Sequence, residues 1–193
     1  ADLFHAISHP TISDVIYRDL KTAKRVRLHR DMAVAFELRY AHAPMALEIV
    51  GEHYRKAGEI GKAFRYLVSA AKRKSIRCMV EEAWSLSERA GGLEETAATE
   101  LNVDAYRTLR RDLLAVRASV FDSRGAWNDA AKGWLAVLGI AEEDRDPQTA
   151  CDARLQLAKV LRRKGDHDGS RRHSEQALEA ARLLNDNHKG GEA

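Results

Sequence analysis

Few residues in this chain have the types and spacing that metal or phosphate chemistry requires. His5 and His9 are four residues apart, the spacing at which a helix can present two zinc ligands. They precede Pro10, however, in a segment that we expect to form a short strand over residues 3–9. No third ligand is evident in the sequence, so we expect no metal site there.

Two other motifs resemble ligand-binding loops but are incomplete. A phosphate-binding loop needs Gly-x-x-x-x-Gly-Lys-Ser/Thr, and in the nearest match, Gly61-Lys62, the next residue is Ala63. Residues 166–169 have the acidic groups and glycine of a calcium loop, but Ala177 stands where a bidentate glutamate is needed. Both segments are better explained as turns between helices.

Catalytic constellations are also missing from the sequence. No Ser/His/Asp or Cys/His set shows an organising motif. The adjacent carboxylates at 94–95 and 142–143 fit helix ends rather than a desolvated acid–base pair. The three tryptophans could stack on bases, but their spacing favours packing between helices. The sequence therefore predicts no catalytic residue, cofactor or metal, and a protein that is not an enzyme.

Composition favours a helical chain. Of its 193 residues 45% are hydrophobic and only three are proline, and no apolar run approaches the ~18 residues of a membrane span. No secretory signal is recognisable, and the two cysteines, Cys78 and Cys151, stand far apart in the chain and suggest reduced thiols. We expect a cytoplasmic protein that does not enter a membrane. Because the sequence begins with Ala1 rather than Met, we expect a piece of a longer chain.

Charge is unevenly distributed along the chain. The formal net charge is +3, with +6 in residues 1–75, −5 in residues 76–150 and +2 in the remainder. This distribution fits either solvated helix faces or a surface for a charged partner. Hydrophobic periodicity gives the elements. We expect helices over about 10–20, 26–38, 43–58, 61–74, 81–90, 102–123, 126–141, 148–164 and 167–185.

Three glycines predict tight turns between helices: Gly58, Gly125 and, more weakly, Gly165. A small residue comes seven positions before each glycine, a bulky one four before and a small one five after. Small residues let antiparallel helices approach closely, and bulky ones fill the space between pairs. The aligned residues are Gly51, Ala118 and Ala158, then Tyr54, Phe121 and Leu161, then Ala63, Ala130 and Ser170.

This order of residues resembles the tetratricopeptide repeat. The resemblance implies an all-α fold, an antiparallel helix-pair solenoid that winds into a superhelix. The sequence departs from the family in its spacing, because Gly125 and Gly165 are farther apart than the usual repeat length of about 34 residues. It also departs at Ser170 and Ser174, which stand where Ala and a bulky residue belong. The implied repeats are about 43–75, 74–92 (degenerate), 102–141 and 147–185.

The N-terminal third resembles a second pattern. It contains His9-Pro10-Thr11-Ile12 through Leu20, then Arg27-Leu28-His29, and finally Glu52-His53-Tyr54 at the entry to the repeats. In this order the motifs are similar to those of large bacterial signalling ATPases, STAND/AAA-type regulators that are often fused to nucleotide cyclase, kinase or transcription-factor modules. The resemblance implies that residues 1–40 end a preceding domain and complete a winged-helix-like unit. Repeats would then fill 41–186, followed by a flexible tail over 187–193.

The repeat family binds its partners on the first helix of each pair, just before the turn. Carried onto this sequence, the resemblance implies a concave surface with basic groups at both ends, suited to an acidic peptide or a phosphate-bearing ligand. The alternative is that these side chains are solvated or pack on the rest of a parent protein. The implied residues are Glu52, Arg55, Lys56, Ser119, Asp122, Ser123, Lys159, Arg162 and Arg163.

Three functions follow from these patterns. The first is a non-catalytic protein-interaction or ligand-sensing module of a multidomain signalling regulator, whose partners could include neighbouring domains or a second copy. The second is a free-standing adaptor that recruits a protein. The third, which the sequence favours less, is a nucleic-acid-binding helical domain that uses the basic segment 21–30 and whose binding would weaken steeply with salt.

Overall fold

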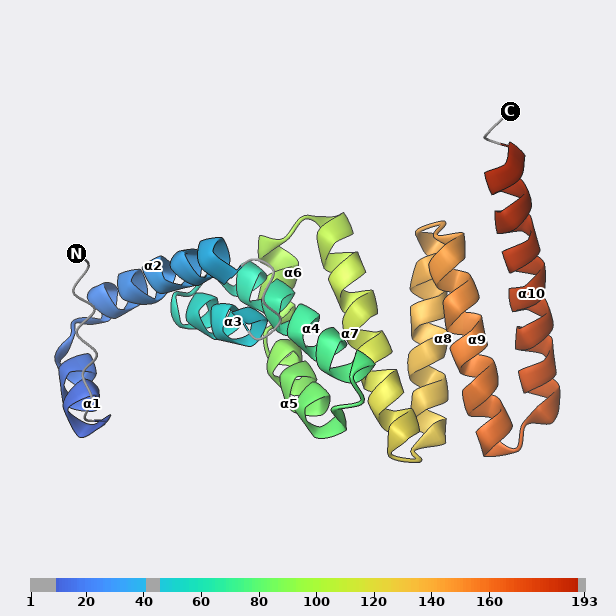
Figure 1. The fold of residues 1–193 in the computed structure, drawn as a ribbon, viewed down its shortest axis with the longest axis horizontal. Coiled ribbons are helices and arrows are strands. Elements are labelled where there is room, and N and C mark those ends of the chain that lie inside the picture. The colour runs from blue at the N-terminus through green and yellow to red at the C-terminus, as the bar shows by residue number, and fades with distance from the viewer. Residues whose placement is uncertain (1–9, 41–45, 191–193) are drawn as a thin grey trace.

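The computed structural model describes residues 10–40 and 46–190, and within these ranges it contains ten helices and no strand. The helices follow one another along the long axis of the molecule, from α1 at one end to α10 at the other (Figure 1). The expected all-α, solenoid-like fold is therefore confirmed. The helices are α1 (Pro10–Asp19), α2 (Thr22–Tyr40), α3 (Ala46–Lys56), α4 (Ile60–Ile76), α5 (Val80–Gly91), α6 (Glu94–Glu100), α7 (Val103–Ser123), α8 (Trp127–Glu143), α9 (Pro147–Lys164) and α10 (His167–Gly190).

Five turns between consecutive helices share one hydrogen-bond pattern. In each, a left-handed residue donates its N–H to the carbonyl three residues back, and the next residue donates to the carbonyl five back, as Glu59 does to Tyr54 at 3.0 Å. This is the Schellman motif. Gly58, Gly125 and Gly165 occupy the left-handed position with φ of 78°, 74° and 89°. Glycine adopts this conformation without steric cost, so all three are turn residues as predicted.

The other two turns place Cys78 and Arg145 at the left-handed position, with φ of 57° and 54°. Their N–H groups donate to Ser75 and Glu142, as the motif requires. Turn residues therefore recur at a constant step, at 58 and 78 and again at 125, 145 and 165. Sequence reasoning placed a break at Asp146-Pro147 but missed both left-handed residues, because no glycine marks them.

The position five residues after each turn residue is small in all five cases. Ala63, Ala83 and Ala130 have no exposed surface. The fifth case, Ser170, is partly buried and donates its hydroxyl to the Ala158 carbonyl at 2.9 Å, so its polar atom is satisfied. A small residue at this position lets the helix axes come close together. The five residues are Ala63, Ala83, Ala130, Ala150 and Ser170.

The hydrophobic core is a row of small clusters rather than one centre. Tyr54 is fully buried where α2, α3 and α4 meet. Phe64 and Leu113 belong to a larger cluster shared by α4, α5 and α7. Leu138 and Leu157 mark the two clusters that join α7, α8 and α9. From α2 to α5 and from α6 to α10 each helix therefore packs on the next, as expected of a solenoid, and α7 also packs on α4 and α5 across α6.

The elements differ from the sequence prediction in two places. A seven-residue helix, α6, lies between the predicted helices 81–90 and 102–123, where no helix was expected. The last helix was expected to end at 185, with a flexible tail from 187, but α10 continues to Gly190. The predicted strand over 3–9, with His5 and His9, lies outside the described residues.

The unexpected helix α6 has a structural role at the start of α4. Glu100 accepts a hydrogen bond from the backbone N–H of Gly61 at 2.7 Å, which satisfies one of the N–H groups left free in the first turn of α4. Leu101 packs beside it, and a Cβ at Gly61 would lie 3.2 Å from the Leu101 side chain. The segment after α5 thus caps a helix that begins much earlier in the chain.

Backbone conformation at the turns gives a first prediction. Replacing Arg145 by Gly should raise the free energy of unfolding by about 0.5–1 kcal/mol, because a left-handed residue with a Cβ is strained. Gly125→Ala should lower it by about 1–2 kcal/mol for the same reason, since no atom lies within 4 Å of the added Cβ and only the backbone is strained. Arg145→Ala is the control for loss of the side chain. The free energies of unfolding are measured in urea. If Arg145→Gly is no more stable than Arg145→Ala, residue 145 is not strained by its left-handed conformation.

Close packing at Ala130 gives a second prediction. Ala130→Arg should cost on the order of 3 kcal/mol of unfolding free energy, because the site has no exposed surface and cannot hold a large charged group. Asn128→Arg, at an exposed position on the same helix, should leave the unfolding midpoint nearly unchanged. Equal midpoints for the two variants would show that the assigned helix register is wrong.

Candidate functional site

The nine residues predicted to contact a partner lie near the C-terminal ends of α3, α7 and α9. The structure joins them in pairs within two separate groups, one on α3 and one across α7 and α9. Among the described residues, no hydrogen bond or ion pair connects the two groups. These facts do not test the concave surface that the resemblance implies, which stays a prediction.

In the α3 group, Glu52 forms hydrogen bonds that hold α5 against α3. Glu52 accepts from Arg55 at 3.0 Å and from the Nε of Arg89 on α5 at 3.1 Å. Arg89 also donates to Glu48 at 2.7 Å, so one guanidinium bridges two carboxylates of α3. Burial alone would raise the pKa of Glu52, but the hydrogen bonds from Arg89 and Arg55 outweigh it and lower that pKa. Of the three predicted residues here, Lys56 is exposed and outside these pairs.

The α7 and α9 group is also partly used within the protein. Asp122 on α7 forms an ion pair with Arg163 on α9. Ser123 donates its hydroxyl to the Ser119 carbonyl at 3.0 Å, within the same helix. Four of the six predicted residues in this group thus already have partners in the folded chain.

Arginines elsewhere on these helices are neutralised in the same way. Arg117 reaches Glu88 at 3.1 Å, and Arg124 reaches Glu81 at 2.8 Å. Arg124 also lies over the ring of Trp84, 4.9 Å from its centroid. These pairs connect α5 to α7. The paired side chains therefore hold the two helices together and are not free to bind a ligand while the pairs are formed.

The three tryptophans divide between core and surface. Trp134 packs against both clusters between α7 and α9, as predicted. Trp84 packs against Phe121, with ring centroids 5.4 Å apart. Trp127, also expected to pack between helices, is 39% exposed.

The end of α9, like the end of α4 at Arg73 and Arg77, carries exposed cations that form no ion pair among the described residues. Lys159, Arg162 and Lys164, which we call the α9 cation group, are all exposed. Within the described part of the chain none of them forms an ion pair, and Lys159 only approaches the Gln156 side chain at 3.5 Å. Of the predicted residues, Lys159 and Arg162 are thus the ones that remain available at this end of the molecule.

The helix carbonyls beneath the α9 cation group are already satisfied. The Gly165 N–H donates to the Arg162 carbonyl at 3.1 Å and the Asp166 N–H to the Leu161 carbonyl at 2.9 Å. The side-chain cations are therefore not needed to complete the helix end, although they still favour its negative dipole end. Exposed Lys and Arg groups of this kind can bind carboxylates or phosphates through charge-assisted hydrogen bonds.

Sequence reasoning missed a polar cluster that joins the first three helices. The hydroxyl of Tyr17 on α1 lies 2.8 Å from Nε2 of His29 on α2, and Nδ1 of His29 lies 2.9 Å from Nδ1 of His53 on α3. Phe36 stacks on His53, with ring centroids 5.8 Å apart. Each residue stands in a motif quoted above, but sequence alone does not show that the three side chains meet.

The geometry restricts how this histidine pair can be protonated. A hydrogen bond between two Nδ1 atoms needs one donor and one acceptor, so the two imidazoles cannot both be charged. Burial lowers the pKa of His29, helped by the neighbouring His53 and Lys56. Burial and Lys56 also lower the pKa of His53, while Glu52 opposes them. The fold therefore favours a neutral pair.

A second buried network lies beside it. The hydroxyls of Tyr54 on α3 and Tyr66 on α4 both donate to the carboxylate of Glu37 on α2. The two hydrogen bonds lower the pKa of Glu37. Burial, and after it the hydrogen bond to the Glu37 carboxylate, raises the pKa of Tyr66 to about 12. Glu37 is thus a structural anion that ties α2 to the start of the solenoid.

Within residues 10–40 and 46–190, no group of three or more histidine, cysteine, aspartate or glutamate side chains is placed to hold a metal ion. No helix in these ranges is both long and apolar enough to cross a bilayer.

Comparison with known proteins gives little to set beside this geometry. No protein-family model and no curated protein matches the chain. Among solved structures, the chain is similar to the crystal structure of BtubC (BKLC) from P. vanneervenii, with 15% sequence identity and a TM-score of 0.48. That alignment covers 89% of this chain and 78% of the other.

The histidine pair gives a third prediction. Because folding lowers both pKa values below the ordinary ~6.5, the unfolded chain binds more protons below that pH. The contribution of the neutral histidine pair to the free energy of unfolding should be fully present above about pH 6.5. It should be lost as the pH falls from there toward the pKa values of the folded state. The melting temperature should therefore decline more steeply in the wild type than in a His29→Gln/His53→Gln double variant.

A control and a local readout make this test specific. His167→Gln, at an exposed position on α10, should keep the wild-type slope. A shallow slope remains in the double variant because burial also lowers the pKa of His173. Hydrogen exchange should show that the loss begins in residues 15–40. Identical slopes in the wild type and the double variant would rule out the pair as the sensitive element.

Proposed function

We propose that this chain is a non-catalytic binding module that captures an acidic protein segment at the α9 cation group. The observation that supports it is the contrast in pairing between helices. Arginines on α5 and α7 are held by carboxylates of neighbouring helices, whereas Lys159, Arg162 and Lys164 face solvent and form no ion pair in the described part of the chain. Clusters of exposed, uncompensated cations attract anionic partners and raise their association rates.

The chemistry of these side chains favours carboxylate or phosphate groups. Arginine presents a planar fork of N–H donors that matches both anions, and lysine adds a mobile point charge. Arg163 next to the group is held by Asp122, which fixes one edge of the surface. The partner is therefore an extended segment with several Asp, Glu or phosphorylated residues, rather than a single small anion.

We also propose that the module serves a larger signalling regulator of the tetratricopeptide-containing ATPase type. The order of motifs in residues 9–37 supports this assignment, as do the repeated turns and small residues of the solenoid. Two successive steps between turn residues, from Gly125 through Arg145 to Gly165, make a helix pair longer than the usual repeat of about 34 residues. The array would accordingly be a divergent one, with partner capture on the solenoid biasing the rest of the protein.

Selection from a random peptide library on the wild-type chain tests the proposal. Enriched peptides should be rich in Asp and Glu, and Lys159→Glu/Arg162→Glu should weaken their binding by roughly tenfold or more, measured by fluorescence anisotropy. Arg77→Glu is the matched control, since it reverses an exposed charge at another inter-helix turn. Enrichment of peptides without acidic residues, or unchanged binding in the double variant, would overturn the assignment.

A further inference from the structure

Helix α2 is apolar on two faces, and within residues 10–40 and 46–190 one of them is packed against another helix. Its inner face packs on α3 through His29, Ala33 and Phe36. Its outer face carries Leu28 and Met32, which are 42% and 37% exposed. A surface helix normally presents a polar outer face to water, so the packing among the described residues does not account for the second apolar face.

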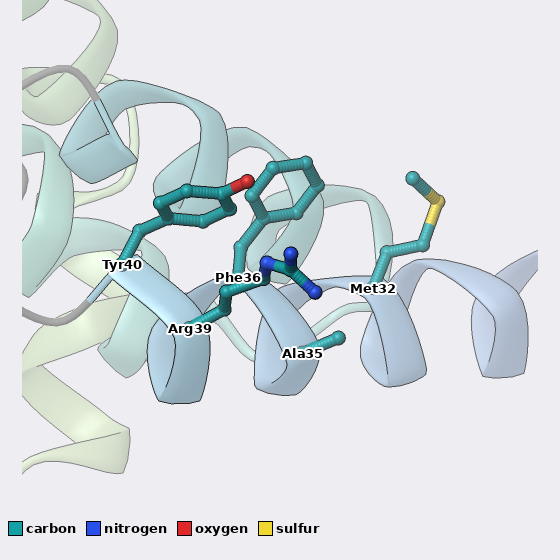
Figure 2. Close-up of a pocket in the computed structure, with 5 residues that line it drawn as sticks. All are labelled: Met32, Ala35, Phe36, Arg39 and Tyr40. Carbon is teal, nitrogen blue, oxygen red and sulfur yellow. The ribbon is translucent and has the colours of Figure 1, made fainter.

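The outer face is hollowed along its length. One cavity of about 480 Å³ lies at the border of the two faces, bounded by Met32, by Phe36, whose ring also stacks on His53, and by Tyr40; these side chains rise from successive turns of α2 (Figure 2). A second, of about 490 Å³, lies toward the start of the helix beside Leu20 and Leu28. Leu28 and Met32 are one turn apart, so the two hollows follow one another along the same helix. We call the surface from Leu20 to Tyr40 that includes both hollows the α2 stripe; at 1.5 Å per residue it is about 30 Å long.

Positive charges flank the α2 stripe. Lys24, Arg27 and Arg39 line the two cavities, against the single carboxylate of Asp31. Arg27 approaches Asp31 only at 3.8 Å, with both side chains largely exposed. Two copies of this face would place like charges together, which disfavours a dimer through it. The charge instead complements an acidic partner.

We propose that the α2 stripe binds an amphipathic helix with acidic flanks, supplied by a partner protein. Length supports a helix, because a stripe of about 30 Å matches roughly 20 helical residues. Leucine-type side chains of the partner enter the hollows beside Met32 and Phe36, where the flexible thioether adapts to their shape. Glutamates on the edges of the partner helix pair with Lys24 and Arg39. This follows the helix-in-groove mode of recognition.

This surface is separate from the α9 cation group. The α2 stripe lies at the N-terminal end of the stack and α9 lies near the other end (Figure 1). The α9 cation group needs only negative charge, whereas the α2 stripe needs an apolar helix face as well. The two proposals can therefore fail independently.

The probe is a fluorescein-labelled peptide of about 20 residues with leucines at helical i, i+3, i+4 and i+7 spacing and glutamates on its edges. Binding to the full chain is followed by anisotropy. A scrambled peptide of equal composition and a peptide with lysine in place of glutamate should each bind at least tenfold more weakly. Equal binding of either one would overturn the proposal, because the helix face or the charge would then not matter.

Variants locate the contact. Met32→Glu and, separately, Lys24→Glu/Arg39→Glu should each weaken binding by roughly tenfold or more. The second variant changes only exposed side chains, so it tests the surface even where Met32→Glu disturbs folding. The variants are compared on a Lys159→Glu/Arg162→Glu background, which removes capture of the acidic probe by the α9 cation group, and Leu178→Glu, at a residue 53% exposed on α10, should bind like that background. Complete loss of binding in the background itself would assign the peptide to the α9 cation group and overturn the α2 site.

Sedimentation velocity of the wild-type chain tests the alternative occupant of the α2 stripe, a second copy of the chain. We expect a monomer at the concentrations used for binding. A dimer that Met32→Glu dissociates would show that a second copy covers the stripe, and would overturn the proposed partner helix.

Discussion

The left-handed turn between helices is the constraint on which this structure depends. At each of five turns, one residue with positive φ reverses the chain while two backbone N–H groups satisfy the last carbonyls of the preceding helix. Five residues later a small side chain lets the next helix approach closely. Reversal and close approach are thus set by two positions per unit. The remaining positions are free to build the clusters, ion pairs and exposed groups that distinguish one helix from another.

The fold was largely predictable because these two positions are visible in the sequence. Gly58, Gly125 and Gly165 carry the turn and an alanine or serine follows each at the fixed distance. Cys78 and Arg145 occupy the same conformation without a glycine, since tertiary packing outweighs a local preference of about 1–2 kcal/mol. Helix α6 escaped detection because its few polar and small residues have no clear period.

The candidate sites were only partly predictable, for a different reason. The helix and face of Glu52 or Asp122 follow from the repeat pattern, but their partners Arg89 and Arg163 lie on other helices, far away in the sequence. Which cations remain exposed therefore depends on every neighbouring helix. The cluster of Tyr17, His29 and His53 has the same character, because its members come from three helices. Sequence locates such residues, and only the packed helices show which of them meet.

The insertion of α6 shifts the register of the repeating turns in the helical stack. The regular step from Gly58 to Cys78 is interrupted before Gly125, after which it resumes through α8, α9 and α10. The contacts change at the same point: α7 packs on both α4 and α5 across the insertion, whereas from α7 to α10 each helix packs on the next. A long partner that follows the stack would therefore meet a change of helix register at α6, whereas two short partners could each use one side of it.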